Sequence, residues 1–174
     1  MLKILIVEDD RQLASTLEYL VEDNPRYRVA GIAEDLAGAV ELAEARNPDL
    51  ALVDLHLARG TTGFSVAVRL SDFNIPCLFV SGKAPSFAMP DLALGCLTKP
   101  FTGEDVHRAL AMAEDIMRGR ETLRHRVPGN LRLYEAQEET TALENAAFIP
   151  GRRSFKSRIE QWITGAALLR VGTL

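Results

Sequence analysis

Five residues spread along the chain carry side chains that together could bind a metal ion and transfer a phosphoryl group. They are Glu8, Asp9, Asp54, Ser81 and Lys99. Carboxylates placed close together repel each other, so a pocket formed by the three acidic residues needs a cation. Mg²⁺ suits such a pocket, because it prefers oxygen ligands and commonly uses one or two carboxylates with phosphate oxygens and water.

With a metal bound, Asp54 could attack phosphorus as a nucleophile and form an acyl phosphate. The metal and the Lys99 ammonium would stabilise negative charge on the transferred group. Ser81 could donate a hydrogen bond to one of its oxygens. Each residue alone has a commoner structural explanation, such as a strand end or a helix cap. Their occurrence in order after successive apolar runs favours the chemical interpretation.

Short apolar runs predict how these residues come together. Three such runs lead directly into Glu8, Asp54 and Ser81, at residues 3–7, 50–53 and 77–80. Runs of this kind are typical of strands buried in a parallel sheet. Because α/β sheets form their sites at the carboxyl edge of the strands, we expect the three side chains to meet there. Lys99 would reach the same edge from the next strand.

Strand and helix patterns alternate through the first two thirds of the chain. This order predicts an α/β fold with a doubly wound, five-stranded parallel sheet and right-handed crossovers. The predicted strands are about Leu2–Val7, Tyr27–Ala33, Leu50–Val53, Cys77–Val80 and Cys96–Leu97. The predicted helices are about Gln12–Glu22, Leu36–Ala45 and Phe64–Leu70, with a last one from Thr102 through Ile116 or as far as Leu123.

The composition is that of a soluble globular protein, with 47% hydrophobic and 25% charged residues among 174. No apolar run approaches the ~20 residues of a membrane span, so we expect no membrane contact. Met1 leads straight into the first predicted strand, which predicts that no signal peptide is present. The two cysteines fit no disulfide framework or metal spacing, which favours the reducing cytoplasm.

The motifs around the five residues resemble the receiver domain of bacterial two-component response regulators over about residues 2–117. ILIVEDD is similar to the acid-pair strand, LALVDLHL to the phosphoacceptor strand, CLFVSG to the hydroxyl-bearing strand and TKPF to the lysine turn. The resemblance implies a flavodoxin-like (CheY-like) receiver fold. We assign it to residues 1–120, and residues 121–174 to a C-terminal extension.

The resemblance also implies a role for each site residue. Asp54 would be the phosphoacceptor, contacted through its phosphoryl group by Ser81 and Lys99. The implied Mg²⁺ ligands are Glu8 through water, Asp9, Asp54 and the backbone carbonyl of His56. The phosphoryl group would come from a histidine kinase or a phosphotransfer protein. Such a domain catalyses its own phosphorylation and dephosphorylation and is not a conventional enzyme.

Two features depart from the family pattern. Cys96 stands three residues before Lys99, where the family has an aromatic residue that moves together with the Ser or Thr hydroxyl during switching. A thiol is too small for that movement. Ser81 and Lys99 are 18 residues apart, closer than is common in the family. Because Pro85 and Pro90 also oppose a long helix, we expect the helix of the family pattern to be short, irregular or mobile over residues 83–94.

Residues 121–174 match no known output domain and are predicted to be mostly helical, with a short strand at Leu131–Tyr134. An apolar stripe at helical spacing over residues 154–169 must pack on the receiver, on a second copy or on a partner. Residues 118–174 carry 10 Lys and Arg against 6 Asp and Glu, so a DNA-binding regulator is one alternative. No recognition-helix pattern supports it. The second alternative, suggested by Cys96, is a pseudo-receiver that signals without phosphorylation.

Overall fold

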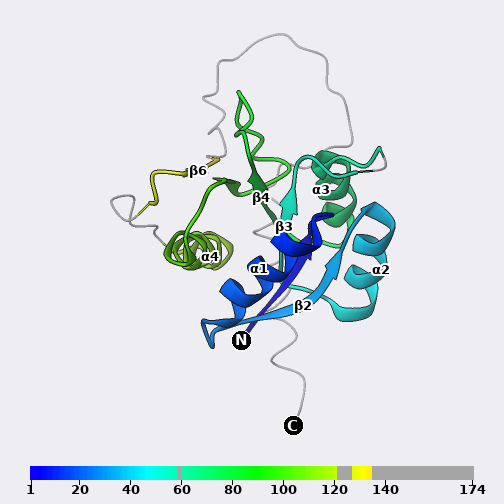
Figure 1. The fold of residues 1–174 in the computed structure, drawn as a ribbon, viewed down its shortest axis with the longest axis horizontal. Coiled ribbons are helices and arrows are strands. Elements are labelled where there is room, and N and C mark those ends of the chain that lie inside the picture. Colours follow the sequence, from blue (N-terminus) through cyan, green and yellow to red (C-terminus); the bar gives the residue numbers. More distant parts are fainter. Residues whose placement is uncertain (59, 121–126, 135–174) are drawn as a thin grey trace, which may run out of the picture.

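The computed structural model describes residues 1–58, 60–120 and 127–134, which form one six-stranded sheet with helices on both faces (Figure 1). The strands are β1 Leu2–Val7, β2 Tyr27–Ala33, β3 Leu50–Asp54, β4 Cys77–Ser81, β5 Gly95–Thr98 and β6 Leu131–Leu133. The helices are α1 Arg11–Glu22, α2 Leu36–Arg46, α3 Gly63–Asp72 and α4 Gly103–Met117. None of these helices is long and apolar enough to cross a membrane.

The strand order in the sheet is β2-β1-β3-β4-β5-β6. The first five strands pair in parallel, and β6 pairs antiparallel with β5. The predicted doubly wound α/β fold is therefore confirmed. The structure adds a sixth strand at the edge, formed by the short strand expected in the extension and lying beyond the predicted boundary at residue 120.

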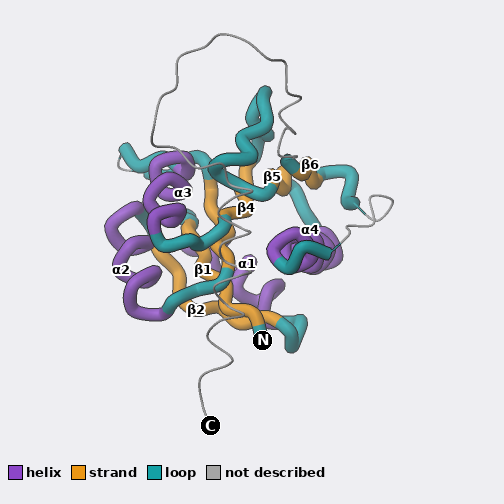
Figure 2. The backbone as a smooth tube through the Cα atoms, turned by 180° about the vertical axis from the view of Figure 1, so that it is seen from behind, coloured by secondary structure: helices purple, strands orange, loops and turns teal. Residues whose placement is uncertain are grey.

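The helices cover the two faces of the sheet in pairs, as the alternating order requires (Figure 2). Side chains of α1 and α4, such as Leu17 and Leu110, are buried in one apolar cluster with Ile4, Ile6 and Leu97. Side chains of α2 and α3 are buried in the other cluster, with Val53, Phe79 and Cys96. The two layers bury β3, β4 and the second half of β1 completely, which explains their continuous apolar runs.

The connection between β4 and β5 contains no helix in its described residues, 82–94. Turns and bends fill it instead, so the irregular segment expected from Pro85 and Pro90 is confirmed. The last helix ends at Met117, with Arg118 as its C-cap and Gly119 at a positive φ, so its possible continuation to Leu123 is wrong. The predicted helix over 154–169 and most of the predicted extension lie outside the described residues.

Candidate functional site

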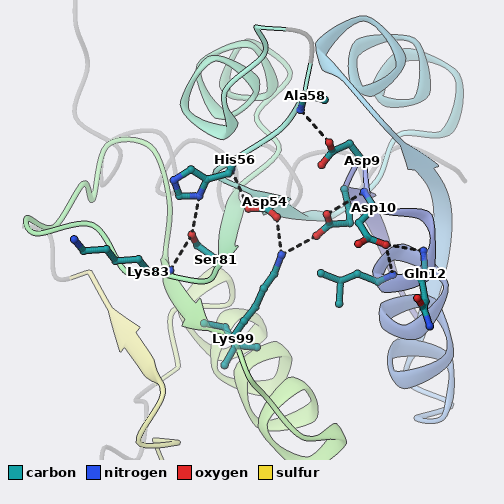
Figure 3. A network of polar contacts seen from close by, with 12 residues as sticks. Asp9, Asp10, Gln12, Asp54, His56, Ala58, Ser81, Lys83 and Lys99 are labelled. Carbon is teal, nitrogen blue, oxygen red and sulfur yellow. Dashed lines mark hydrogen bonds and ion pairs between the residues drawn. The ribbon is translucent and has the colours of Figure 1, made fainter.

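Four of the predicted site residues meet where β1, β3, β4 and β5 end. Asp54, Ser81 and Lys99 can be followed in Figure 3. Asp54 and Ser81 are the last residues of β3 and β4, whereas Glu8 and Lys99 directly follow β1 and β5. The exposed fractions are only 2% for Glu8, 7% for Asp54 and 0% for Ser81. The parallel register brings these ends to one edge, because the apolar runs stop within one residue of the same level of the sheet.

Lys99 joins the two buried carboxylates. Its Nζ donates to Asp54 Oδ2 at 2.6 Å and to Glu8 Oε2 at 3.0 Å. Partial burial lowers the pKa of Lys99, but the hydrogen bonds to Asp54 and Glu8 and their charges outweigh it, and the pKa is raised. Burial raises the pKa of Glu8 despite the opposing effect of Lys99. Lys99 is therefore an ammonium ion, and it supplies the positive charge that both carboxylates require.

The second oxygen of Asp54 faces the loop that follows β3. Asp54 Oδ1 accepts a hydrogen bond from the His56 N–H at 3.0 Å. The loop folds back at Gly63, whose N–H donates to the Leu55 carbonyl at 3.1 Å. A Cβ at Gly63 would lie 2.2 Å from the Asp54 carbonyl oxygen, so only glycine permits this approach. Both carboxylate oxygens of Asp54 are thus held in place by their neighbours.

The two aspartates after Glu8 point to different partners. Asp9 Oδ2 accepts from the Ala58 N–H at 3.0 Å, which ties the end of β1 to the loop after β3 (Figure 3). Asp10 is the N-cap of α1, and its Oδ1 accepts from the Gln12 and Leu13 N–H groups. Asp10 is therefore used for capping, which agrees with its place outside the matched acid pair.

The His56 side chain reaches Ser81, a contact that the sequence did not predict. His56 Nδ1 lies 3.3 Å from Ser81 Oγ, and the Lys83 N–H donates to the same hydroxyl at 3.4 Å (Figure 3). The sequence identified His56 only through its backbone carbonyl. Its position two residues after Asp54 was the available signal, but the direction of the ring depends on the fold of the loop.

The oxygen-rich donor set has the chemistry that Mg²⁺ prefers, with carboxylates from two adjacent strand ends. In the described part of the chain, however, no three His, Cys, Asp or Glu side chains are already arranged as a metal site. Glu8 and Asp54 instead pair with Lys99, and Asp9 pairs with a backbone N–H. The donors fit the ion by chemistry, and in this arrangement the lysine supplies the positive charge.

Residues 4–111 match the model of the response regulator receiver domain family, and the chain belongs to that family. Its fold and its motif set therefore define a receiver domain of a two-component response regulator. Several proteins with this domain are similar in sequence or structure.

The chain is 34% identical over 116 residues to the phyllosphere-induced regulator PhyR of Methylorubrum extorquens, covering 64% of this chain and 43% of PhyR. It is 30% identical over 122 residues to the sensory transduction protein LytT of Bacillus subtilis, covering 68% and 50%. The signal receiver domain of a modulated diguanylate cyclase from Desulfovibrio desulfuricans matches with a TM-score of 0.54 and 32% identity, covering 64% of this chain and 91% of that domain. The chain spans about half the length of these two curated relatives.

Proposed function

We propose that this receiver accepts a phosphoryl group on Asp54 and signals through protein–protein contacts. The observation that carries the proposal is the joint contact of the Lys99 ammonium with Asp54 and Glu8 at the carboxyl edge of the sheet. This contact joins two carboxylates that are less than a tenth exposed to a lysine whose side chain is 22% exposed. Such a cation is in position to stabilise charge that develops on a transferred phosphoryl group.

In the proposed reaction, a carboxylate oxygen of Asp54 forms a bond to phosphorus while the bond between phosphorus and the donor's leaving atom breaks. The leaving group takes its electron pair with it. Lys99 then contacts the phosphoryl oxygens, and Ser81 donates its hydroxyl proton in a hydrogen bond to one of them. Hydrolysis of the resulting acyl phosphate by water restores Asp54. The domain would thus catalyse both steps on itself without being a conventional enzyme.

Magnesium is the proposed cofactor, and its ligands would come from Glu8, Asp9, Asp54 and the backbone carbonyl of His56. When bound, it would offset the charge of the carboxylates against that of the incoming phosphoryl group. Lys99 would then be free to move from the carboxylates toward the phosphoryl oxygens. The buried position of Glu8, only 2% exposed, supports its role as a charge that needs a cation.

The proposed phosphodonor partner is a histidine kinase or a phosphotransfer protein, as expected for a receiver. We keep the division into a receiver over residues 1–120 and an extension over 121–174 as part of the proposal, with residues 127–134 docked on the receiver sheet. A homodimer and the cytoplasmic location stay predictions. The DNA-binding alternative concerns mainly residues outside those that the structure describes.

Intact-mass measurement after treatment with acetyl phosphate tests the proposal. The full chain is expected to gain the mass of one phosphoryl group with Mg²⁺ and none with EDTA. Asp54→Asn should gain nothing. Asp10→Asn is the matched control, because asparagine caps a helix as well as aspartate does, and it should gain the group as the parent does. Equal gain by Asp54→Asn would refute the assignment, and no gain by the parent would favour the pseudo-receiver alternative.

A further inference from the structure

The residues just before β6 contact the turn that carries Lys99, although they lie outside the family match to residues 4–111. The Thr98 N–H donates to the Asn130 carbonyl at 2.8 Å. The side-chain Nδ2 of Asn130 lies 3.4 Å from the Thr98 carbonyl oxygen and 3.2 Å from the Pro100 carbonyl oxygen. Asn130 therefore contacts the backbone on both sides of Lys99.

The same amide also reaches helix α4. Asn130 Nδ2 lies 3.3 Å from Asp105 Oδ2, and Asp105 in turn accepts from the Thr102 N–H at 2.8 Å. The Thr102 N–H and hydroxyl, followed by Asn130, lower the pKa of Asp105. The turn between β5 and α4 is thus closed by one side chain that contacts both ends of it.

The orientation of the Asn130 amide follows from its neighbours. Its nitrogen faces three oxygen atoms that can only accept, since they belong to two backbone carbonyls and a carboxylate. A flipped amide would place its own oxygen against all three, which is unfavourable. Two N–H groups shared among three acceptors are compatible with the distances of 3.2 to 3.4 Å.

Lys99 is held from the other side by β4. Its N–H donates to the Ser81 carbonyl at 2.8 Å, next to the site. Strand β5 is four residues long, and Lys99 follows it directly. Strand β6 closes the outer edge of β5, where the pairs Cys96–Arg132 and Leu97–Leu131 fix its register. The lysine backbone is therefore clamped between β4 on one side and Asn130 on the other.

We propose that Asn130 is a positioning residue for Lys99, holding the Thr98–Pro100 turn so that the ammonium reaches Asp54 and Glu8. The receiver site would then depend on a residue beyond the family match. The contact of Asn130 with the Thr98–Pro100 turn is independent of the proposed phosphorylation. Only its consequence for the rate of phosphoryl transfer rests on the proposed function.

The first test uses the full chain without any phosphodonor. Asn130→Asp keeps the size of the side chain but removes both donors and places a negative charge against three acceptors. Arg132→Gln, two residues further along in β6, is the matched control, since Arg132 Nη1 contacts the Pro85 carbonyl and not the lysine turn. The readout is the NMR signal of the Lys99 Cε methylene, assigned by its loss in Lys99→Arg.

Asn130→Asp is expected to shift the Lys99 signal, and Arg132→Gln is expected to leave it in place. A purely structural role for Asn130 would lower the unfolding temperature without moving this signal. An unmoved Lys99 signal in folded Asn130→Asp would overturn the proposal. If Asn130→Asp does not fold, Asn130→Ala removes the same donors without adding charge, and the same two outcomes decide.

The second test measures the initial rate of phosphorylation by acetyl phosphate with Mg²⁺. Loss of positioning should slow Asn130→Asp on the order of tenfold to a hundredfold. In a Lys99→Ala background the same change should cost nothing more, because the group that it positions is gone. If Asn130→Asp lowers the rate by the same factor with and without Lys99→Ala, the proposal is overturned. A parent chain that gains no phosphoryl group would refute the proposed function, while the Lys99 signal still decides the role of Asn130.

Discussion

Replacement of Lys99 by Met, with metal ions chelated, tests how much the lysine charge stabilises the two buried carboxylates of the site. Among the described residues, Lys99 is the one cation that forms an ion pair with Glu8 or Asp54. Both carboxylates are less than a tenth exposed. Met has a similar length but no charge, so the substitution leaves two buried like charges without a cationic partner among the described residues.

The expected loss of stability follows from burial. Removing one partner of a fully buried ion pair costs about 3–5 kcal/mol. The Lys99 side chain is 22% exposed, and one carboxyl group can take up a proton, so the expected loss of unfolding free energy is about 2–4 kcal/mol at about pH 8. Changing Glu8 to Gln in the same chain should recover part of this loss, because only one buried charge then remains.

The loss should also depend on pH. Burial already raises the pKa of Glu8 in the parent, and Lys99 opposes that rise, so its removal raises the pKa further. A carboxyl group whose pKa is raised by folding stabilises the protein fully below its unfolded pKa, and that stability disappears as the pH rises through the folded pKa. The deficit of Lys99→Met should therefore be smaller at about pH 5 than at about pH 8.

Urea unfolding in EDTA at both pH values measures these effects. Arg108→Met is the control, because the Arg108–Glu104 pair is exposed on α4 and should contribute less than about 1 kcal/mol. Added Mg²⁺ should stabilise Lys99→Met more than the parent. If Lys99→Met is as stable as the parent in EDTA, or if Glu8→Gln gives no recovery, the idea that Lys99 compensates both carboxylates is wrong.

Two further substitutions and one labelling experiment test other parts of the structure. Gly95→Ala should displace β6, because its Cβ would lie 2.5 Å from the Arg132 carbonyl oxygen, and hydrogen exchange at the Thr98 and Tyr134 amides should become faster; unchanged protection would contradict the tight pairing. Gly63→Ala should cost more than about 2 kcal/mol of unfolding free energy, measured by urea unfolding, and should slow phosphorylation, measured by intact mass. Parental values in both experiments would show that the loop after Asp54 can adjust. Burial raises the pKa of Cys77 to about 12, and burial together with the charge of Asp54 raises the pKa of Cys96 to about 11. Both thiols should therefore react with Ellman's reagent at about pH 8 only after unfolding. Fast reaction in the native chain would rule out their burial.

Much of the fold could be predicted because local patterns determine it. The apolar runs before Glu8, Asp54 and Ser81 mark strands that are buried on both faces, and a parallel arrangement then places these residues at one edge. The strand Tyr27–Ala33 has the predicted bounds, and α1 differs from its prediction by one residue. The proline-containing connection also behaves as its composition predicts.

The parts that could not be predicted depend on contacts between distant segments. Asp9 bonds to the Ala58 N–H, and the His56 ring reaches Ser81, because the loop after β3 folds over the end of β1 and β4. Strands β5 and β6 are separated in the sequence by the whole of α4, and their pairing needs glycine at position 95. No local pattern around residue 131 specifies which strand it joins.

The pairing of β6 also bears on the small residue at position 96. Tyr134, directly after β6, is 7% exposed and lies in the same buried cluster as Cys96 and Phe79. Burial raises the pKa of Tyr134 to about 12, and Cys96 adds to that effect. An aromatic ring is therefore present in the cluster that contains Cys96, but it belongs to Tyr134 after β6 and not to β5 itself. Because β5 and β6 share backbone hydrogen bonds, the strand that precedes residue 135 is held directly on the strand that ends just before Lys99.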